Sequence, residues 1–286
     1  MIMTEGRRRI VRAAAVALVT LLALSSACSS AGPQPTGDNV QSVSPPAVSP
    51  STAASSIVAR PPTGIDYAAM KRRLAQEIRD GAGPLVEVRA VLVSVDGRTE
   101  LEFYQQRKPT EQAHIYSVTK TVISILVGIA VDEGRLQLDQ TLSELLPEQV
   151  QVMTPEQRDI TLEQLLTMTG GVTGSATGLD VKKGDPVEMI LTYGMDSEPG
   201  TIFGYSGASA HLVATALRRA IDRPILGYAR EKLFDPLGIV TRPAWEGSDR
   251  FAKGGFDDAG FAWLVDSTGV HGGGYGLRLT ARDLVK

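Results

Sequence analysis

The sequence is poor in the residue types that most often crosslink a chain or bind metals. Cys28 is the only cysteine, so an intramolecular disulfide is excluded. The three histidines, His114, His211 and His271, are far apart, and none lies in an H-x-x-x-H pattern or beside a cysteine. We therefore expect neither a metal site nor another cofactor.

Long apolar runs, phosphate loops and basic excess are missing as well. A bilayer-spanning helix needs about 20 apolar residues, and neither 13–24 nor 121–131 reaches that length. No stretch matches G-x-x-x-x-G-K-[ST], so the glycine-rich segment 169–184 is predicted to be a surface loop that could line a cleft. The formal net charge of -3 argues against nucleic acid as a partner.

The first 28 residues have the layout of an export signal. Four arginines between positions 7 and 12 precede an apolar run over 13–24, and small residues lead to Cys28. This position resembles a bacterial lipoprotein cleavage site, where the cysteine is acylated. Ordinary secretion is the alternative, because Ser25 stands where leucine is usual. Loss of a leader with four arginines and one glutamate would lower the net charge to about -6. We expect an exported protein, either an outward-facing membrane lipoprotein or secreted.

Composition places the folded domain after a linker. Residues 29–64 are rich in serine, proline and alanine and cannot bury enough surface to offset their ordering entropy, so we expect disorder. The domain is predicted over 65–286. It should begin with a helix capped by Asp66 and ending near Asp80.

A hairpin should follow this helix. Two β-rich stretches, 86–95 and 98–106, flank Asp96-Gly97, a strong turn signal. In the second stretch, apolar and charged residues alternate, so one face should be buried, as in an antiparallel sheet.

The most informative stretch is Ser117-Val118-Thr119-Lys120, at the head of an apolar run. Residues i and i+3 share a helix face, so a helix starting near Ser117 would hold hydroxyl and ammonium side by side. A serine hydroxyl needs such an activator to become a good nucleophile, and burial would help the lysine by lowering its pKa. The alternative is a helix-capping serine with a solvated lysine.

The apolar run also predicts the position of this helix. Residues 118–131 leave almost no polar face, so the helix should lie in the middle of a domain, with Gly134 as its left-handed cap. Asp139 is predicted to cap a short helix ending at Pro147, and Thr161 to open another.

Five segments in order carry a family resemblance. They are YSVTKTVISILVGIAVDEGRLQLDQTL from Tyr116, ITLEQLLTMTGGV at 160–172, PGTIFGYSGASAHLVATAL at 199–217, LFDPLGI at 233–239 and GYGLRLTARDLVK at 274–286. Together they resemble the serine β-lactamase-related hydrolases, which include class C β-lactamases, DD-peptidases, esterases and 6-aminohexanoate-dimer hydrolases. The resemblance covers about residues 66–286. It implies an α+β fold of the β-lactamase/transpeptidase type, an antiparallel sheet with flanking helices plus a mostly helical subdomain.

The resemblance also implies chemistry. Ser117 would form an acyl-enzyme, Lys120 would help to deprotonate it, and Tyr205 would relay the proton to the leaving group. Tyr116 and Gly207 would contact a small-molecule or peptide acyl substrate. Gly207 stands where the family has asparagine in its Tyr-x-Asn motif. The substrate class therefore stays open among β-lactam, D-alanyl peptide, carboxylic ester and linear amide.

The family's third motif, Lys-Thr-Gly or His-x-Gly on a late strand, has only two lookalikes, Lys253-Gly254-Gly255 and His271-Gly272-Gly273. Neither has strand-like flanks, so both are predicted to be loops. Residues 274–286 resemble the segment that precedes the family's last strands. The resemblance thus implies that the motif and one oxyanion donor lie beyond Lys286, while the Ser117 backbone N–H supplies the other donor.

Two alternatives remain. The stretch 204–208, G-Y-S-G-A, resembles a nucleophile elbow between a predicted strand at 200–203 and a helix, which would make Ser206 the nucleophile and His271 the base of an α/β-hydrolase. The chain before it lacks the alternating strands and helices that a parallel sheet requires. The other alternative is a catalytically inactive cell-envelope binding lipoprotein of the same fold, favoured by Gly207.

Overall fold

The computed structural model describes residues 64–80, 87–105, 107–172, 174, 184–248, 256 and 259–286. The predicted leader, Cys28 and nearly all of the linker lie outside the described residues. Within them, no helix is long and apolar enough to cross a membrane. The α-helices are α2 (Tyr67–Arg79), α3 (Thr119–Asp132), α4 (Leu142–Leu145), α5 (Pro155–Arg158), α6 (Leu162–Leu166), α7 (Pro186–Thr192), α8 (Gly207–Ile221) and α9 (Ile225–Ala229). The other helices are η2 (Tyr116–Val118), η3 (Pro147–Val152) and η5 (Asp283–Val285), which are 3₁₀, and the π-helix η4 (Arg230–Phe234).

The described strands are short and pair two by two. They are β1 (Ala90–Val95) with β2 (Arg98–Tyr104), β3 (Ala113–His114) with β6 (Arg278–Leu279), and β4 (Ala244–Trp245) with β5 (Phe261–Ala262). The pair β3–β6 is antiparallel, with Ala113 opposite Leu279, and the pair β4–β5 is parallel. Helices and small sheets together confirm the predicted α+β class.

The chain divides into two compact units, and the hairpin belongs to both of them. Unit 1 runs to Val88 and includes 94–101, and unit 2 comprises 89–93 and 102–286. In unit 1, α2 begins as predicted, because the Asp66 carboxylate accepts the Ala69 N–H at 2.7 Å. The predicted turn is confirmed as well, since Asp96 and Gly97 both have positive φ, as a type I′ turn requires.

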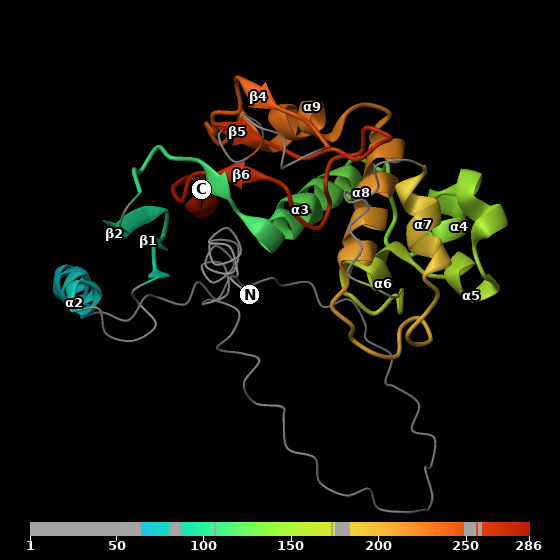
Figure 1. Cartoon of the computed structure of the whole chain (residues 1–286), viewed down its shortest axis with the longest axis horizontal. Helices are drawn as coiled ribbons and strands as arrows, with labels where there is room; N and C mark the ends of the chain where they lie inside the picture. Colours follow the sequence, from blue (N-terminus) through green and yellow to red (C-terminus); the bar gives the residue numbers. More distant parts are fainter. Residues whose placement is uncertain are drawn as a thin grey trace, which may run out of the picture. The chain divides into compact units, whose positions relative to one another are not determined.

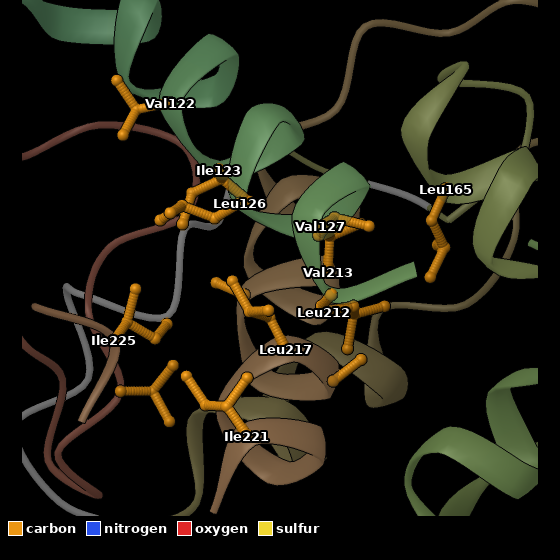
Figure 2. Close-up of a cluster of buried hydrophobic side chains, with 14 of the residues drawn as sticks. Val122, Ile123, Leu126, Val127, Leu165, Leu212, Val213, Leu217, Ile221 and Ile225 are labelled. Atoms are coloured by element: carbon orange, nitrogen blue, oxygen red, sulfur yellow. The ribbon is translucent and has the colours of Figure 1, made fainter. Parts of the chain in front are cut away.

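The core of unit 2 lies between α3 and α8, which pack side by side (Figure 1). Apolar residues of α3 recur with the period of a helix and are buried along one face. Each such side chain stabilises the fold by about 1.5–3 kcal/mol when it leaves water. Figure 2 shows this face meeting α8, α6 and α9 through Val122, Ile123, Leu126, Val127, Leu165, Leu212, Val213, Leu217 and Ile225.

The opposite face of α3 is exposed, which corrects the prediction of a helix with almost no polar face. Ser124 and Ile125 lie on it, and Ile125 is 44% exposed. The left-handed residue predicted after the helix is confirmed, since Gly134 has φ of +70°.

Threonine N-caps begin three short helices of unit 2, α4, α5 and α6. Thr161 opens α6 as predicted, and its hydroxyl accepts the Gln164 N–H at 3.2 Å. The cap predicted at Asp139 is wrong, because Thr141 and Glu144 form a capping box that starts α4 two residues later. The strand predicted at 200–203 is also absent, because the chain turns at 199–202 and has no regular secondary structure over 203–206 before α8 begins.

Candidate active site

The turn that carries Ser117 is held between β3 and α3. The N–H of Ile115 donates to the Leu277 carbonyl at 3.0 Å, which continues the β3–β6 pairing to the edge of the turn. Tyr116 then adopts φ of +48°, a left-handed conformation that is uncommon outside glycine. The buried Thr119 hydroxyl donates to the Tyr116 carbonyl at 2.7 Å. These bonds present Ser117 at the surface, directly before the first turn of α3.

Ser117 and Lys120 are within hydrogen-bond distance, with 3.2 Å between Lys120 Nζ and Ser117 Oγ. The helix α3 begins at Thr119 rather than at Ser117, which lies in the 3₁₀ turn η2. Ser117 and Lys120 are close all the same, because side chains three residues apart are aligned along a 3₁₀ turn. The pairing therefore follows from the spacing in the sequence.

Lys120 is half-buried, not buried as predicted, and its second acceptor is the Gly274 carbonyl at 2.7 Å. Among the described residues, no carboxylate lies within salt-bridge distance of its ammonium. Within the described residues, its hydrogen-bond acceptors are therefore one hydroxyl and one peptide carbonyl. Such an ammonium would stabilise an alkoxide on Ser117, and the neutral amine could accept the hydroxyl proton.

Tyr205 completes the group, with its ring centroid 4.9 Å from Lys120 Nζ. It lies two residues before α8 and is 59% exposed. A tyrosine ring and an ammonium at this distance attract each other. Three residues that the sequence separates by up to 88 positions thus meet around one nitrogen atom.

Gly207 is buried as the first residue of α8 and has no side chain to offer Lys120. The backbone of Gly274 lies close to both residues instead. A Cβ on Gly274 would be 3.4 Å from the Gly207 carbonyl oxygen and 3.4 Å from Lys120 Nζ. The other residue assigned to the substrate, Tyr116, is half-buried, and its ring lies 4.0 Å from that of His114.

The structure does not bring together the parts of a nucleophile elbow. Ser206 is only 4% exposed, and its Oγ caps α8 by accepting the Ser209 N–H at 3.0 Å. His271 pairs with Glu246 instead, with 2.9 Å between Nε2 and Oε2. This bond lowers the pKa of the Glu246 carboxyl.

A pocket of about 140 Å³ adjoins Tyr205. The glycine-rich segment contributes to its wall, as predicted, although positions 173 and 175–183 lie outside the described residues. The pocket is lined by Gly171, Val172, Gly174, Asp196, Ser197, Ile202, Gly204, Tyr205 and Ser206.

Two parts of the site had no counterpart in the sequence-based assignment, namely Thr119 and the Gly274 carbonyl. Gly274 follows His271-Gly272-Gly273, which lies outside the named strands, although His271 forms an isolated antiparallel β-bridge with Val265. Residues 253–255 lie outside the described residues. Three consecutive glycines were the available signal, because such runs mark close backbone approach. No group of metal-ligating side chains occurs in the described part of the chain.

Most of the chain is similar to proteins of known families. The family model described as Beta-lactamase matches residues 73–286. Penicillin-binding protein 4 of Amycolatopsis lactamdurans is 29% identical over 128 residues, which are 43% of this chain and 33% of that protein. Lovastatin esterase of Penicillium rubens is 27% identical over 161 residues, which are 48% of this chain and 40% of the esterase. The chain thus aligns with less than half the length of these curated relatives.

The fold has solved counterparts. The beta-lactamase/D-alanine carboxypeptidase from Pseudomonas syringae superposes with a TM-score of 0.56 at 16% identity, covering 77% of this chain and 63% of that structure. At this identity the likeness concerns the fold alone.

Proposed function

Since the chain belongs to the Beta-lactamase family, whose members include serine hydrolases, we propose that it is a serine hydrolase that cleaves an amide or ester through an acyl-enzyme on Ser117. The observation that carries this proposal is the distance of 3.2 Å between Lys120 Nζ and Ser117 Oγ, with the Tyr205 ring centroid 4.9 Å from the same nitrogen.

Ser117, Lys120 and Tyr205 have separate roles in the proposed reaction. The Ser117 oxygen attacks the acyl carbon while its proton passes to the neutral amine of Lys120, and the carbonyl oxygen becomes an oxyanion. The Ser117 backbone N–H, just before α3, is one donor to that oxyanion. As the bond to the leaving group breaks, Tyr205 delivers its hydroxyl proton to the departing nitrogen or oxygen and takes up the proton held by Lys120, which restores both side chains. Water then adds to the acyl carbon, the bond to Ser117 Oγ breaks, and the acid product leaves as the Ser117 oxygen regains a proton.

The substrate is proposed only as a class, a small-molecule or peptide acyl compound. Relatives of this chain carry names as different as penicillin-binding protein and lovastatin esterase. Gly207 provides no side-chain amide to contact a substrate amide, so the enzyme should depend less on that contact than family members with asparagine.

A second candidate is a non-enzymatic binder of the same fold, and Gly207 is the observation that favours it. In this case the site would hold an acyl ligand without forming a covalent bond. Covalent labelling distinguishes the two candidates.

The test of the proposed function is labelling with a fluorophosphonate probe, read as an intact-mass shift, on the protein encoded by the complete reading frame. The wild type should be labelled and Ser117→Ala should not be labelled at all. Ser206→Ala is the matched control, because it should lose about 1 kcal/mol of cap stability and keep its label. A shift that survives in Ser117→Ala and vanishes in Ser206→Ala would support the elbow hydrolase, and an unlabelled wild type would support the binder.

We also propose that the protein is exported and anchored through a lipid on Cys28, on the basis of the leader sequence. Partition of the wild type into the detergent phase, lost in Cys28→Ala, would support this location. Partition into the aqueous phase by both would mean that no lipid anchor is present, and recovery of the protein from the culture medium would then support secretion.

A further inference from the structure

The Gly274 carbonyl, which accepts from Lys120, belongs to a loop that two contacts fix to α8. This loop, residues 266–276, is called the acceptor loop below. Asp266 at its start pairs with His211 of α8, with 3.0 Å between Oδ2 and Nε2. Gly273 presses on the same helix, since a Cβ there would lie 2.8 Å from Ala214 Cβ and closer still to the Ala210 carbonyl oxygen. Only a residue without a side chain allows this approach.

The His211–Asp266 pair is completely removed from water, since both side chains are 0% exposed. The other carboxylate oxygen of Asp266 accepts from the Thr268 N–H and hydroxyl at 2.8 Å each and from the Val270 N–H at 2.9 Å. These bonds close the turn that begins the acceptor loop. Since an ionised carboxylate only accepts, the proton between the two side chains lies on His211 Nε2.

Buried pairs of this kind often add little to stability, because desolvation offsets their attraction. They do fix geometry, since neither partner has an alternative once it is buried. The helix that carries His211 starts two residues after Tyr205. One helix, α8, therefore sets the position of both groups that approach Lys120 from outside α3 and the turn before it, Tyr205 and the Gly274 carbonyl.

We propose that His211 and Asp266 are positioning residues for acylation, because they hold the acceptor loop on α8 and thereby keep the Gly274 carbonyl at Lys120 Nζ, beside Ser117. This inference deepens the proposed function and rests on it for its kinetic part. Neither residue touches the reacting atoms. Their effect passes through one backbone carbonyl.

The experiment compares His211→Leu with His211→Gln. Leucine removes the donor, whereas the Gln amide N–H can reach Asp266 from nearly the same place. For labelling of Ser117 by a fluorophosphonate, the maximal rate should fall about tenfold or more in His211→Leu and recover to within about threefold of wild type in His211→Gln. The half-saturating probe concentration should stay within about twofold of wild type, because the loop positions the lysine and not the probe.

Gln157→Leu is the matched control for loss of a buried hydrogen bond. Gln157 is also 0% exposed, and its side chain donates to the Leu191 carbonyl at 2.9 Å, between α5 and α7. This variant should be destabilised to a similar degree and label within about threefold of the wild-type rate. An equal loss of labelling in Gln157→Leu would overturn the proposal, as would a folded His211→Leu that labels like wild type.

Amide hydrogen exchange provides a readout that needs no activity. The Gly272 and Gly276 N–H groups are bonded to the Leu264 carbonyl and to His114 Nε2, at 2.8 and 3.2 Å. Their exchange should speed up about tenfold or more in His211→Leu and not in Gln157→Leu. Unchanged exchange would overturn the positioning role. An unlabelled wild type with the expected exchange pattern would overturn the proposed function alone.

Discussion

Two regions of unit 2 supply the surroundings of Lys120, and they do so by different means. The helical region, α3 with the turn before it, contributes Ser117, which is three residues from the lysine. The acceptor loop contributes a backbone carbonyl that is 154 positions away in the sequence. The first contribution depends on which side chains are present. The second depends on how closely the main chain of the loop can approach Lys120. In the sequence, the glycines that permit this approach are its only sign.

The space around one glycine in each region, Gly128 in α3 and Gly273 in the acceptor loop, shows the same difference. Gly128 lies in α3 on the exposed face, and a Cβ added there would meet nothing within 4 Å. Gly273 lies in the acceptor loop, and a Cβ there would be 2.7 Å from the Ala210 carbonyl carbon. A side chain would therefore fit at Gly128 and would clash at Gly273. Three experiments test this contrast between the helical region and the acceptor loop.

The largest expected effect tests the side-chain chemistry. Tyr205→Phe keeps the ring beside Lys120 and removes the hydroxyl, so acylation should slow by about 10²–10⁴-fold if Tyr205 transfers a proton. The free energy of unfolding should hardly change, because the residue is largely exposed. Stopped-flow cleavage of a chromogenic anilide, whose departing nitrogen must be protonated, measures the rate.

Tyr193→Phe serves as the control for this prediction. Tyr193 is 50% exposed and follows α7, outside the group around Lys120. Its variant should react at the wild-type rate. A Tyr205→Phe rate within about threefold of wild type would remove Tyr205 from the proposed mechanism.

The next effect is on the free energy of unfolding, which two glycine substitutions should change in opposite directions. Gly128→Ala should stabilise the protein by about 0.5–1 kcal/mol, because alanine favours the helix and has open space. Gly273→Ala should destabilise it by about 1–3 kcal/mol, because the added methyl group pushes the acceptor loop away from α8. Urea unfolding of both variants measures the two values.

The same pair also differs in activity. Labelling of Ser117 should slow in Gly273→Ala and stay unchanged in Gly128→Ala, since only Gly273 lies next to the carbonyl that holds Lys120. If Gly273→Ala were as stable and as reactive as the wild type, the loop would have room that the structure does not show.

The smallest effect concerns pH. Burial raises the pKa of Asp266, but the bonds from His211 and the Val270 N–H outweigh burial and leave the pKa lowered. A carboxyl with a lowered folded-state pKa stabilises the fold above its unfolded pKa of about 4, and this stabilisation is lost as the pH falls through the folded value. The free energy of unfolding should therefore decline less steeply below about pH 4 in Asp266→Asn than in the wild type.

Asp139→Asn is the control for this pH effect, because Asp139 is an exposed carboxylate. Its acid slope should match that of the wild type. Parallel slopes in the wild type and Asp266→Asn would mean that the buried pair does not couple folding to pH.

The sequence determined the features that depend on neighbours along the chain. The spacing of Ser117 and Lys120 fixes their proximity in either an α-helical or a 3₁₀ turn. The caps at Asp66 and Thr161 and the turn at Asp96-Gly97 follow from local hydrogen bonding and φ preferences. Sequence reasoning failed at Asp139, where a better capping box two residues later prevailed.

Only the tertiary structure decided which distant groups meet at Lys120. The identity of Gly274 gives no sign that its carbonyl accepts from a lysine, because every residue has a carbonyl. The role inferred for His211 was likewise out of reach, since a histidine on an apolar helix face can be satisfied in many ways. Its partner Asp266 is 55 positions away, and burial of both side chains joins them. Local interactions set the spacing of side chains, whereas long-range packing sets the place of the backbone that holds them.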